Sequence, residues 1–354
     1  MKKKKVALLA NLKVNAPHWE GIPEDQWDDL DSEKTINAIL EAIRSGGYEG
    51  EFFEGNTTVV ETLPKYKPDI CFNICEGYFG DSREAHIPAM LEMMCIPYTG
   101  SRVLTLALAL DKPMTKRVLD FHGLPTPPFQ TFERADEPLD TSLRFPLFVK
   151  PSREGTSMGV SLKSVVNTYD ELHEQVSHIL DRYHQPALVE EYIEGREITV
   201  GMVGNLNGPI ARRIPHDPNL PRIQSGLRFL PPMEVDLKPY LLTDAVYSNR
   251  LKVALAEDLN YICPAPLDED MVDELNWLAA AVFRVLGALD VARVDFRLDV
   301  KDNWKPYILE INPLPGLSPG ISDLVIAAKA DGMEHEELIL TILQTAMQRY
   351  NLLD

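Results

Sequence analysis

The fold is decided by two short alternating stretches, Ala292-Arg293-Val294-Asp295-Phe296-Arg297 and Tyr307-Ile308-Leu309-Glu310-Ile311-Asn312. Period-two geometry puts Arg293 and Asp295 on one face of the first strand. It likewise puts Glu310 and Asn312 on one face of the second. If residues 301–304 form the turn of a symmetric hairpin, Asp295 lies opposite Glu310. The same register places Arg293 opposite Asn312, so the sequence predicts two carboxylates that face each other.

Opposed carboxylates repel, and such a pair is destabilising unless water screens it or a cation lies between the two groups. Carboxylate and amide oxygens without Cys or His are hard ligands that suit Mg²⁺. The alternative is a solvated edge hairpin, but Val294, Phe296, Ile308 and Ile311 are too apolar for a hairpin exposed on both faces. We therefore predict a metal site.

A second candidate site is the segment 148–160, in which a strand runs into a loop with glycines and hydroxyl side chains. Gly155 and Gly159 would let backbone N–H groups approach an anion, and Lys150 would add a positive charge. The segment lacks the Gly-Lys-Ser/Thr of a Walker A loop, and a plain hairpin turn explains it equally well. It indicates phosphate binding only together with other features.

A third segment, 188–198, is an apolar strand that turns at Gly195 and resumes with Glu197. Its backbone could contact a purine, and a carboxylate could hold ribose hydroxyls. The alternative is solvated acidic surface, which is the commoner role of acidic turns.

The order of elements predicts an α/β part followed by an α+β part. A strand at 6–9, a helix at 31–44 and a strand at 69–74 alternate as in a parallel sheet covered by helices, and a helical pattern follows at 102–121. The Pro-rich stretch 123–128 then breaks the pattern. Beyond it we expect strands at 145–150, 160–163, 187–192, 197–203, 291–300 and 304–311, and helices at 169–183, 268–286 and 334–350.

Composition narrows the function classes. The chain has 354 residues, about two or three domains' worth, and its net charge of −19 would repel nucleic acid and anionic membranes. The 4 cysteines lack CxxC spacing, so we expect reduced, buried thiols in a cytoplasmic protein. The apolar run at 6–10 is too short for a signal peptide, and no stretch approaches the roughly 18 apolar residues of a membrane helix.

Taken together these features resemble the ATP-grasp superfamily, and more closely the D-alanine-D-alanine ligases. The resemblance runs along nearly the whole chain. It is carried by Asn73-Ile74-Cys75-Glu76-Gly77 with Gly80, Ile96-Pro97-Tyr98-Thr99-Gly100-Ser101, Asp111-Lys112, and the segments 150–159, 190–197, 261–265, 293–295 and 310–316.

The resemblance implies a three-domain ATP-grasp fold of mixed α/β and α+β class. Residues 1–100 would form an N-terminal parallel α/β substrate domain, 101–190 the small ATP-grasp domain, and 191–354 the C-terminal domain with the metal and oxyanion site. The nucleotide would bind between two antiparallel sheets.

The resemblance also implies roles for individual residues. The ATP-binding residues would be Lys112, Lys150 and Ser157 at the phosphates, Glu190, Glu191, Tyr192 and Ile193 at the adenine, and Glu197 at the ribose. The metal, Mg²⁺ with Mn²⁺ as an alternative, would be bound by Asp295, Glu310 and Asn312. Arg293 and the Gly316 amide would form the oxyanion site, and Lys252 would reach the γ-phosphate from a mobile loop.

The implied reaction is phosphorylation of a carboxylate to an acylphosphate, followed by attack of an amine to give a dipeptide, ADP and phosphate. The expected partners are small amino acids and, through the resemblance, a second copy of the chain as a homodimer. The candidate substrate-binding residues are Glu76, Asp31, Thr156 and Ser322.

The chain departs from the family pattern at substrate positions. A Glu-Val-Ser motif is replaced by Asp29-Leu30-Asp31-Ser32-Glu33, His-Gly by Glu76-Gly77, and a Ser-Leu pair by Ile321-Ser322; Val253 replaces a tyrosine. Glu76 could hold a substrate amine, or it could pair structurally with Arg83 or Arg102. These departures keep two alternatives open: a ligase of the same fold that joins other amino acids or amines, and a nucleotide-binding regulator that has lost ligation.

Overall fold

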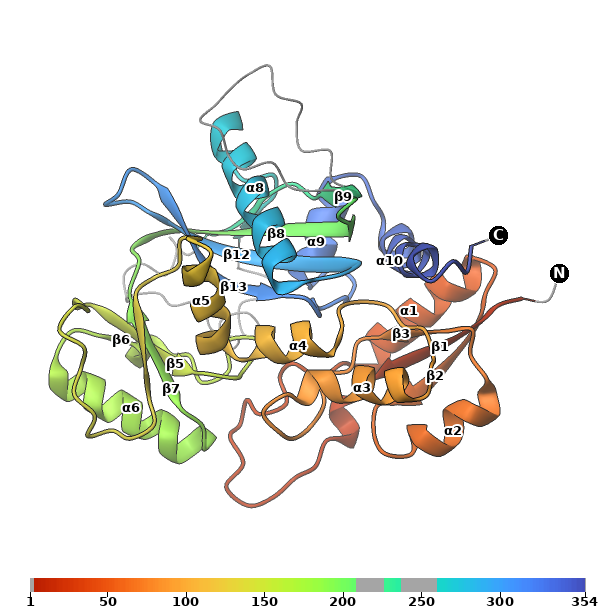
Figure 1. The fold of residues 1–354 in the computed structure, drawn as a ribbon, viewed down its shortest axis with the longest axis horizontal. Helices are drawn as coiled ribbons and strands as arrows, with labels where there is room; N and C mark the ends of the chain where they lie inside the picture. The colour runs from red at the N-terminus through yellow and green to blue at the C-terminus, as the bar shows by residue number, and fades with distance from the viewer. Residues whose placement is uncertain (1–2, 208–225, 237–259, 354) are drawn as a thin grey trace.

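The computed structural model describes residues 3–207, 226–236 and 260–353. Within these residues the chain forms a three-stranded sheet, a four-stranded sheet and a six-stranded sheet (Figure 1). The first is parallel and the other two are antiparallel. The mixed α/β and α+β class expected from the sequence is therefore confirmed.

The N-terminal residues form the parallel sheet, in the order β2-β1-β3. Strand β1 lies between two neighbours and is apolar and buried, as a central parallel strand requires. Ser32 starts helix α1 because its hydroxyl accepts a hydrogen bond from the backbone N–H of Thr35. The elements are β1 (Lys5–Ala10), a 3-10 turn (Lys13–Asn15), α1 (Glu33–Ser45), β2 (Glu49–Glu54), α2 (Val59–Tyr66), β3 (Ile70–Asn73), a 3-10 turn (Arg83–Ala85) and α3 (His86–Met93).

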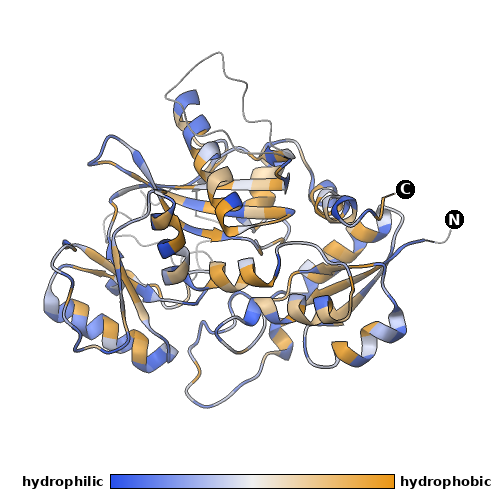
Figure 2. Ribbon diagram, in the orientation of Figure 1, coloured by the Kyte–Doolittle hydropathy of each residue, from blue (hydrophilic) through white to orange (hydrophobic). Residues whose placement is uncertain are grey.

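Two helices, α4 (Val103–Leu110) and α5 (Lys112–Phe121), occupy the predicted helical stretch. Asp111 separates them, and its side chain caps α5 by accepting a hydrogen bond from the N–H of Met114. Helix α4 is apolar along most of its length (Figure 2). Both helices contact α8 (Glu269–Leu286), which lies on the six-stranded sheet.

The four-stranded sheet has the order β4-β7-β5-β6 and is covered by α6 (Figure 1). The predicted strand at 160–163 is wrong. Ser161 and Ser164 form a reciprocal capping box that starts a 3-10 turn, and only two residues after it pair with β5. The elements are β4 (Phe129–Phe132), β5 (Leu147–Pro151), the 3-10 turn (Leu162–Ser164), β6 (Val165–Val166), α6 (Tyr169–Tyr183) and β7 (Ala187–Glu191).

The six-stranded sheet has the order β11-β10-β8-β12-β13, with β9 also paired to β8. The predicted hairpin register is confirmed: Asp295 pairs with Glu310, and Arg293 with Asn312. The symmetric register is wrong between Asp295 and the turn, because a bulge after Asp295 pairs Phe296 with Ile308 instead of Leu309. The strands are β8 (Gly195–Asn205), β9 (Gly226–Phe229), β10 (Met233–Asp236), β11 (Asn260–Ile262), β12 (Val291–Asp299) and β13 (Lys305–Asn312).

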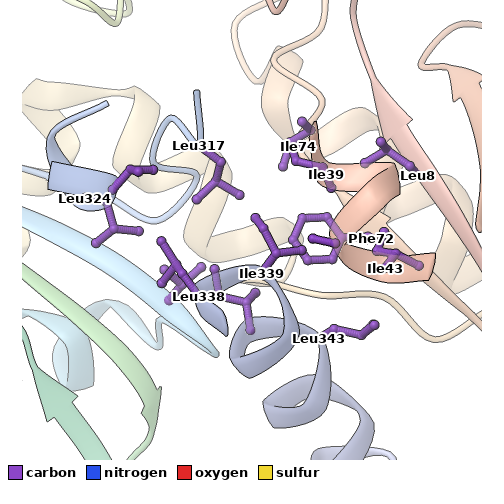
Figure 3. Close-up of a cluster of buried hydrophobic side chains, with 14 of the residues drawn as sticks. Leu8, Ile39, Ile43, Phe72, Ile74, Leu317, Leu324, Leu338, Ile339 and Leu343 are labelled. Atoms are coloured by element: carbon purple, nitrogen blue, oxygen red, sulfur yellow. The ribbon is translucent and has the colours of Figure 1, made fainter. Parts of the chain in front are cut away.

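A shared apolar core joins the first sheet to the C-terminal helices α9 (Asp323–Ala330) and α10 (His335–Arg349). Figure 3 shows side chains of β1, α1 and β3 lying beside side chains of the C-terminal part; the labelled residues are Leu8, Ile39, Ile43, Phe72, Ile74, Leu317, Leu324, Leu338, Ile339 and Leu343. Leu317 belongs to the loop between β13 and α9. This packing holds that loop against the first sheet.

The expectation of buried cysteines is correct for Cys71 and Cys75, but Cys95 is exposed because it follows the end of α3 at the surface. All four are free. None of the helices in the described ranges combines the length and apolar character that a bilayer-spanning segment requires.

Candidate active site

A cavity of about 790 Å³, open solvent included, lies between the four-stranded and six-stranded sheets. All of the residues predicted to bind ATP line it: Lys112, Lys150, Ser157, Glu190, Glu191, Tyr192, Ile193 and Glu197. Phe148, Met158 and Leu309 add apolar surface to the same wall. The cavity thus combines an apolar part with a charged part, in which Lys112, Lys150 and Arg297 lie among six carboxylates.

Two buried lysines meet at Glu190 on β7. Lys150 Nζ lies 2.7 Å and Lys116 Nζ 2.8 Å from the Glu190 carboxylate oxygens. Burial alone would raise the pKa of Glu190, but the two lysines lower it to about 2. The sequence analysis missed Lys116; its only signal was its position one helical turn after Lys112 on α5.

The loop after β5 separates this cavity from a second one. Thr156 and Ser157 both have left-handed backbones, with φ of 50° and 57°, and Thr156 lines the second cavity while Ser157 lines the first. The N–H of Gly159 donates to Asp25 Oδ2 at 2.8 Å. A carboxylate therefore occupies this N–H, and neither Gly155 nor Gly159 lines the first cavity, so their predicted contact with phosphate stays a prediction.

The hairpin of β12 and β13 brings the predicted metal and oxyanion residues together. Arg293 donates to both oxygens of Asp295, each at 2.9 Å, and to Asp323 Oδ2 at 2.8 Å. These bonds use three of its five N–H groups. Thr199 on β8 also donates to Asp295. Asp323, at the start of α9, is a partner of Arg293 that the sequence analysis did not identify.

The donor set at this hairpin fits a hard divalent cation. Burial and the neighbouring Glu310 raise the pKa of Asp295 in spite of Arg293. Burial would also raise the pKa of Glu310, but Lys112, Lys150 and Arg293 lower it. Asn312 donates its amide nitrogen to Asp295 Oδ2 at 3.0 Å, which leaves its amide oxygen without a partner among the described residues. Two adjacent carboxylates and the amide oxygen of Asn312 match the ligands that Mg²⁺ prefers.

A second cavity, of about 1670 Å³ with open solvent included, opens beside the hairpin. It is lined by all of the predicted substrate residues, by both described oxyanion residues and by two of the metal residues: Asp31, Glu76, Thr156, Ser322, Arg293, Gly316, Glu310 and Asn312. Lys112 and Glu310 line both cavities. The two cavities therefore meet at these two side chains. Lys252 lies outside the described residues.

Gly316 lies in the loop that the shared core holds in place. A Cβ atom there would come within 2.9 Å of Ser322 Oγ. The Ser322 hydroxyl in turn accepts a hydrogen bond from the N–H of Ser318 at 2.9 Å. The backbone and the serine are thus packed closely at the edge of the second cavity, and a side chain at position 316 would require the Ser322 hydroxyl to move.

Glu76 follows β3 at the carboxyl end of the parallel sheet. The turn is fixed by Asn11, which accepts a hydrogen bond from the N–H of Gly77 at 2.9 Å. Arg83, one of the two candidates for a structural ion pair with Glu76, instead pairs with Asp29 at 2.7 Å and with Glu154 at 3.4 Å. Within the described residues Glu76 makes no ion pair, and burial together with Glu84 raises its pKa well above the usual range.

The raised pKa of Glu84 predicts a pH-dependent stability. Burial raises it from 4.5 to about 7, so between these values the folded protein holds a proton that the unfolded chain has lost. The free energy of unfolding should therefore decrease as the pH rises through this range. Urea unfolding at pH 5 and pH 8 checks this, and the Glu84→Gln variant should show a smaller decrease than the wild type. An equal decrease in both proteins would contradict the assignment.

A family model described as D-ala D-ala ligase C-terminus matches residues 118–216 and 233–344, which is more than half of the chain. The chain belongs to the D-alanine-D-alanine ligase family. A D-alanine-D-alanine ligase of Pelotomaculum thermopropionicum is 31% identical over 89% of this chain and 92% of its own. A relative of Sinorhizobium fredii, described as uncharacterized protein y4sG, is 35% identical over 90% of this chain and 88% of its own.

The fold agrees with this family. A crystal structure of the D-alanine-D-alanine ligase of Bacillus anthracis complexed with ATP superposes with a TM-score of 0.70 at 20% identity, covering 98% of this chain and 99% of that one. The ATP-grasp fold predicted from the sequence is therefore confirmed. As a member of the ligase family, the chain is an ATP-dependent, ADP-forming enzyme that makes C–N bonds.

Proposed function

We propose that this ligase joins two amino acids into a dipeptide through an acylphosphate, with D-alanine for both substrates as the reference reaction. The observation that carries the proposal is the junction of the two cavities at Lys112 and Glu310. ATP in the first cavity would place its terminal phosphate at this junction, next to a substrate carboxylate in the second. Carboxylate and phosphate would meet where cations are available to offset their charges.

The reaction would proceed in two steps. A carboxylate oxygen attacks the γ-phosphorus, and the bond to the β-γ bridging oxygen breaks to release ADP. The amine of the second substrate then attacks the acyl carbon, the C–N bond forms, and phosphate leaves as the amine loses a proton. Lys112 and Lys150 would neutralise phosphate charge in the first step. The two unused N–H groups of Arg293 and the N–H of Gly316 would stabilise the oxyanion in the second.

We further propose that Asp295, Glu310 and Asn312 hold Mg²⁺, or Mn²⁺ in its place, as their oxygen donors suit either ion. A metal held by these residues would supply positive charge that offsets the charge of the ATP phosphates. The residues would hold it at the rim shared by the two cavities, because Glu310 lines both.

Several finer assignments stay proposals. We keep domain boundaries near residues 100 and 190, a cytoplasmic location, a homodimer, the absence of nucleic-acid partners, and a role in peptidoglycan biosynthesis.

The regulator alternative is disfavoured because the residues predicted for catalysis and metal binding surround these cavities: Lys150, Arg293, Asp295, Glu310 and Asn312. A chain that only senses nucleotide would gain nothing from two buried carboxylates placed opposite each other.

The experiment that tests the proposal is Mg²⁺-dependent ADP release across a panel of D- and L-amino acids, singly and in pairs, with each product identified by mass. D-alanyl-D-alanine from D-alanine alone would support the reference reaction. If D-alanine gives no ADP release and another pair of amino acids does, the result would favour a ligase of the same fold that joins other amino acids or amines. The departures at Asp31 and Glu76 already suggest this alternative. ATP binding with no turnover for any pair would contradict the ligase proposal.

Glu76→Gln should raise the KM for the amino acid by about tenfold or more, because one ionic hydrogen bond to the substrate ammonium is lost. The KM for ATP should change little, since Glu76 lines only the second cavity. Steady-state kinetics measure both constants. Glu61→Gln, at an exposed carboxylate of α2, is the matched control. An unchanged amino-acid KM in Glu76→Gln would remove Glu76 from the substrate site.

A further inference from the structure

The wall that the first sheet contributes to the second cavity is strongly acidic. Asp28, Asp29, Asp31, Glu76 and Glu84 all line it. Two of these carboxylates have basic partners, since Asp28 lies 2.7 Å from Lys13 and Asp29 lies 2.7 Å from Arg83. On the opposite wall, the carboxylates of Glu310 and Asp323 are paired with Lys112 and Arg293.

Three carboxylates of the acidic wall have no such partner. The side chains of Asp31, Glu76 and Glu84 make no ion pair or hydrogen bond with any described residue. Glu84 is only 8% exposed, so solvent does little to stabilise its charge. A buried carboxylate without a partner is costly, and such groups in native proteins are normally paired. Without such a partner a proton offsets the cost, in line with the raised pKa of Glu76 and of Glu84, and a cationic group on whatever occupies the cavity would take the place of that proton.

Neighbouring cations do not fill this role. Arg83 is close enough to lower the pKa of Glu76 and Glu84, but its guanidinium donates to Asp29 and to the carbonyl oxygen of Arg153. A metal ion bound by all three carboxylates is also disfavoured, because within the described residues no three His, Cys, Asp or Glu side chains come together closely enough to hold one. The geometry therefore favours an organic cation with separated charges.

Asp31 comes from the segment directly before α1, Glu76 from the end of β3, and Glu84 from the 3-10 turn before α3. A single α-ammonium is a compact charge with three donors, and it must remain near the carboxylate that is phosphorylated. The two substrates bring one α-ammonium each, which leaves one of the three carboxylates without a cation. We propose that the amino acid bound against this wall carries a second amino group on its side chain, so that the substrate is a diamino acid. This inference rests on the proposed ligase function and specifies its substrate class.

The test compares substrates that differ only in the side-chain charge. Lysine is paired with norleucine, and ornithine with norvaline, each as D- and L-form and each with alanine as the second amino acid. We expect kcat/KM for ADP release to be about tenfold or more higher for the diamino acid of each pair, the value of one charged hydrogen bond. Equal or better turnover of norleucine and norvaline would overturn the inference while leaving the ligase function intact.

Variants connect the preference to the acidic wall. Glu84→Gln should reduce the ratio of kcat/KM between lysine and norleucine by about tenfold, because the charge is removed and the shape is kept. Glu61→Gln, on the exposed face of α2, should leave this ratio unchanged. A thermal melt of each variant establishes that it is folded. A ratio that stays the same in a folded Glu84→Gln protein would contradict the role of this wall.

A binding measurement separates the two proposals. If no pair of amino acids releases ADP, calorimetric titration of lysine and of norleucine into the protein with ATP and Mg²⁺ present still decides the inference. Tighter binding of lysine would support the diamino-acid pocket although the ligase proposal had failed. Equal binding of the two, or binding of neither, would overturn both.

Discussion

Replacing Asn312 by alanine is expected to abolish Mg²⁺-dependent ADP formation, with a loss in kcat of about a hundredfold or more. Asn312 lies opposite Arg293 in the hairpin, and its amide nitrogen donates to Asp295. Its oxygen is the neutral ligand of the proposed metal site. Alanine removes that ligand and also the hydrogen bond that orients the Asp295 carboxylate, while the hairpin backbone is kept.

The metal can be followed directly in this variant. Binding of Mn²⁺, measured by electron paramagnetic resonance, should weaken in Asn312→Ala together with the loss of activity. Asn167→Ala, at an exposed position before α6, removes the same side chain far from the hairpin and should match the wild type. Full activity and unchanged Mn²⁺ binding in Asn312→Ala would contradict the metal assignment.

Arg293→Lys is the second change with a large expected effect. The guanidinium donates to both oxygens of Asp295 and to Asp323, and a lysine ammonium cannot reproduce this planar set of contacts. It also lacks the two further N–H groups that would face the oxyanion. We expect kcat to fall by about a hundredfold to a thousandfold, the usual cost of an oxyanion donor.

Because Arg293→Lys keeps the positive charge, its effect on kcat can be distinguished from an effect on the free energy of unfolding. A lysine keeps a cation beside Asp295 and Asp323, so the free energy of unfolding should fall far less than in an Arg293→Ala protein, in which both buried carboxylates lose their bonds to the guanidinium. The KM for ATP should change little. Arg117→Lys, on the exposed side of α5, is the matched control. A kcat close to that of the wild type would contradict the role of Arg293 in the reaction.

The faces and pairing of the metal residues in the hairpin could be predicted because they depend on residues that lie close together in the sequence. Alternation of polar and apolar residues fixes the faces, and a short polar turn fixes the register, so the pairing of Asp295 with Glu310 follows from the sequence. The bulge after Asp295 could not be predicted, since nothing in the alternation marks it. The pairs between the bulge and the turn are offset by one residue from the symmetric register, and the bulge restores that register at the metal residues.

Other features depend on tertiary packing and have no local signal. Lys116 has the pattern of an ordinary helix residue, and only the approach of β7 buries it against Glu190. Glu84 and Asp29 are separated in sequence and become one acidic wall through the fold of the first sheet. The strand expected at 160–163 failed for a local reason, because two serine side chains stabilise a 3-10 turn there.

The central claim is that a carboxylate is phosphorylated at the junction of the two cavities and then captured by an amine. It is tested most directly by supplying the turned-over amino acids with ¹⁸O in the carboxylate and analysing the released phosphate by mass spectrometry. We expect each phosphate formed with an amide to carry one ¹⁸O, because the oxygen that attacks phosphorus leaves with it. Amide formation with unlabelled phosphate would contradict the acylphosphate and the arrangement of residues proposed to support it.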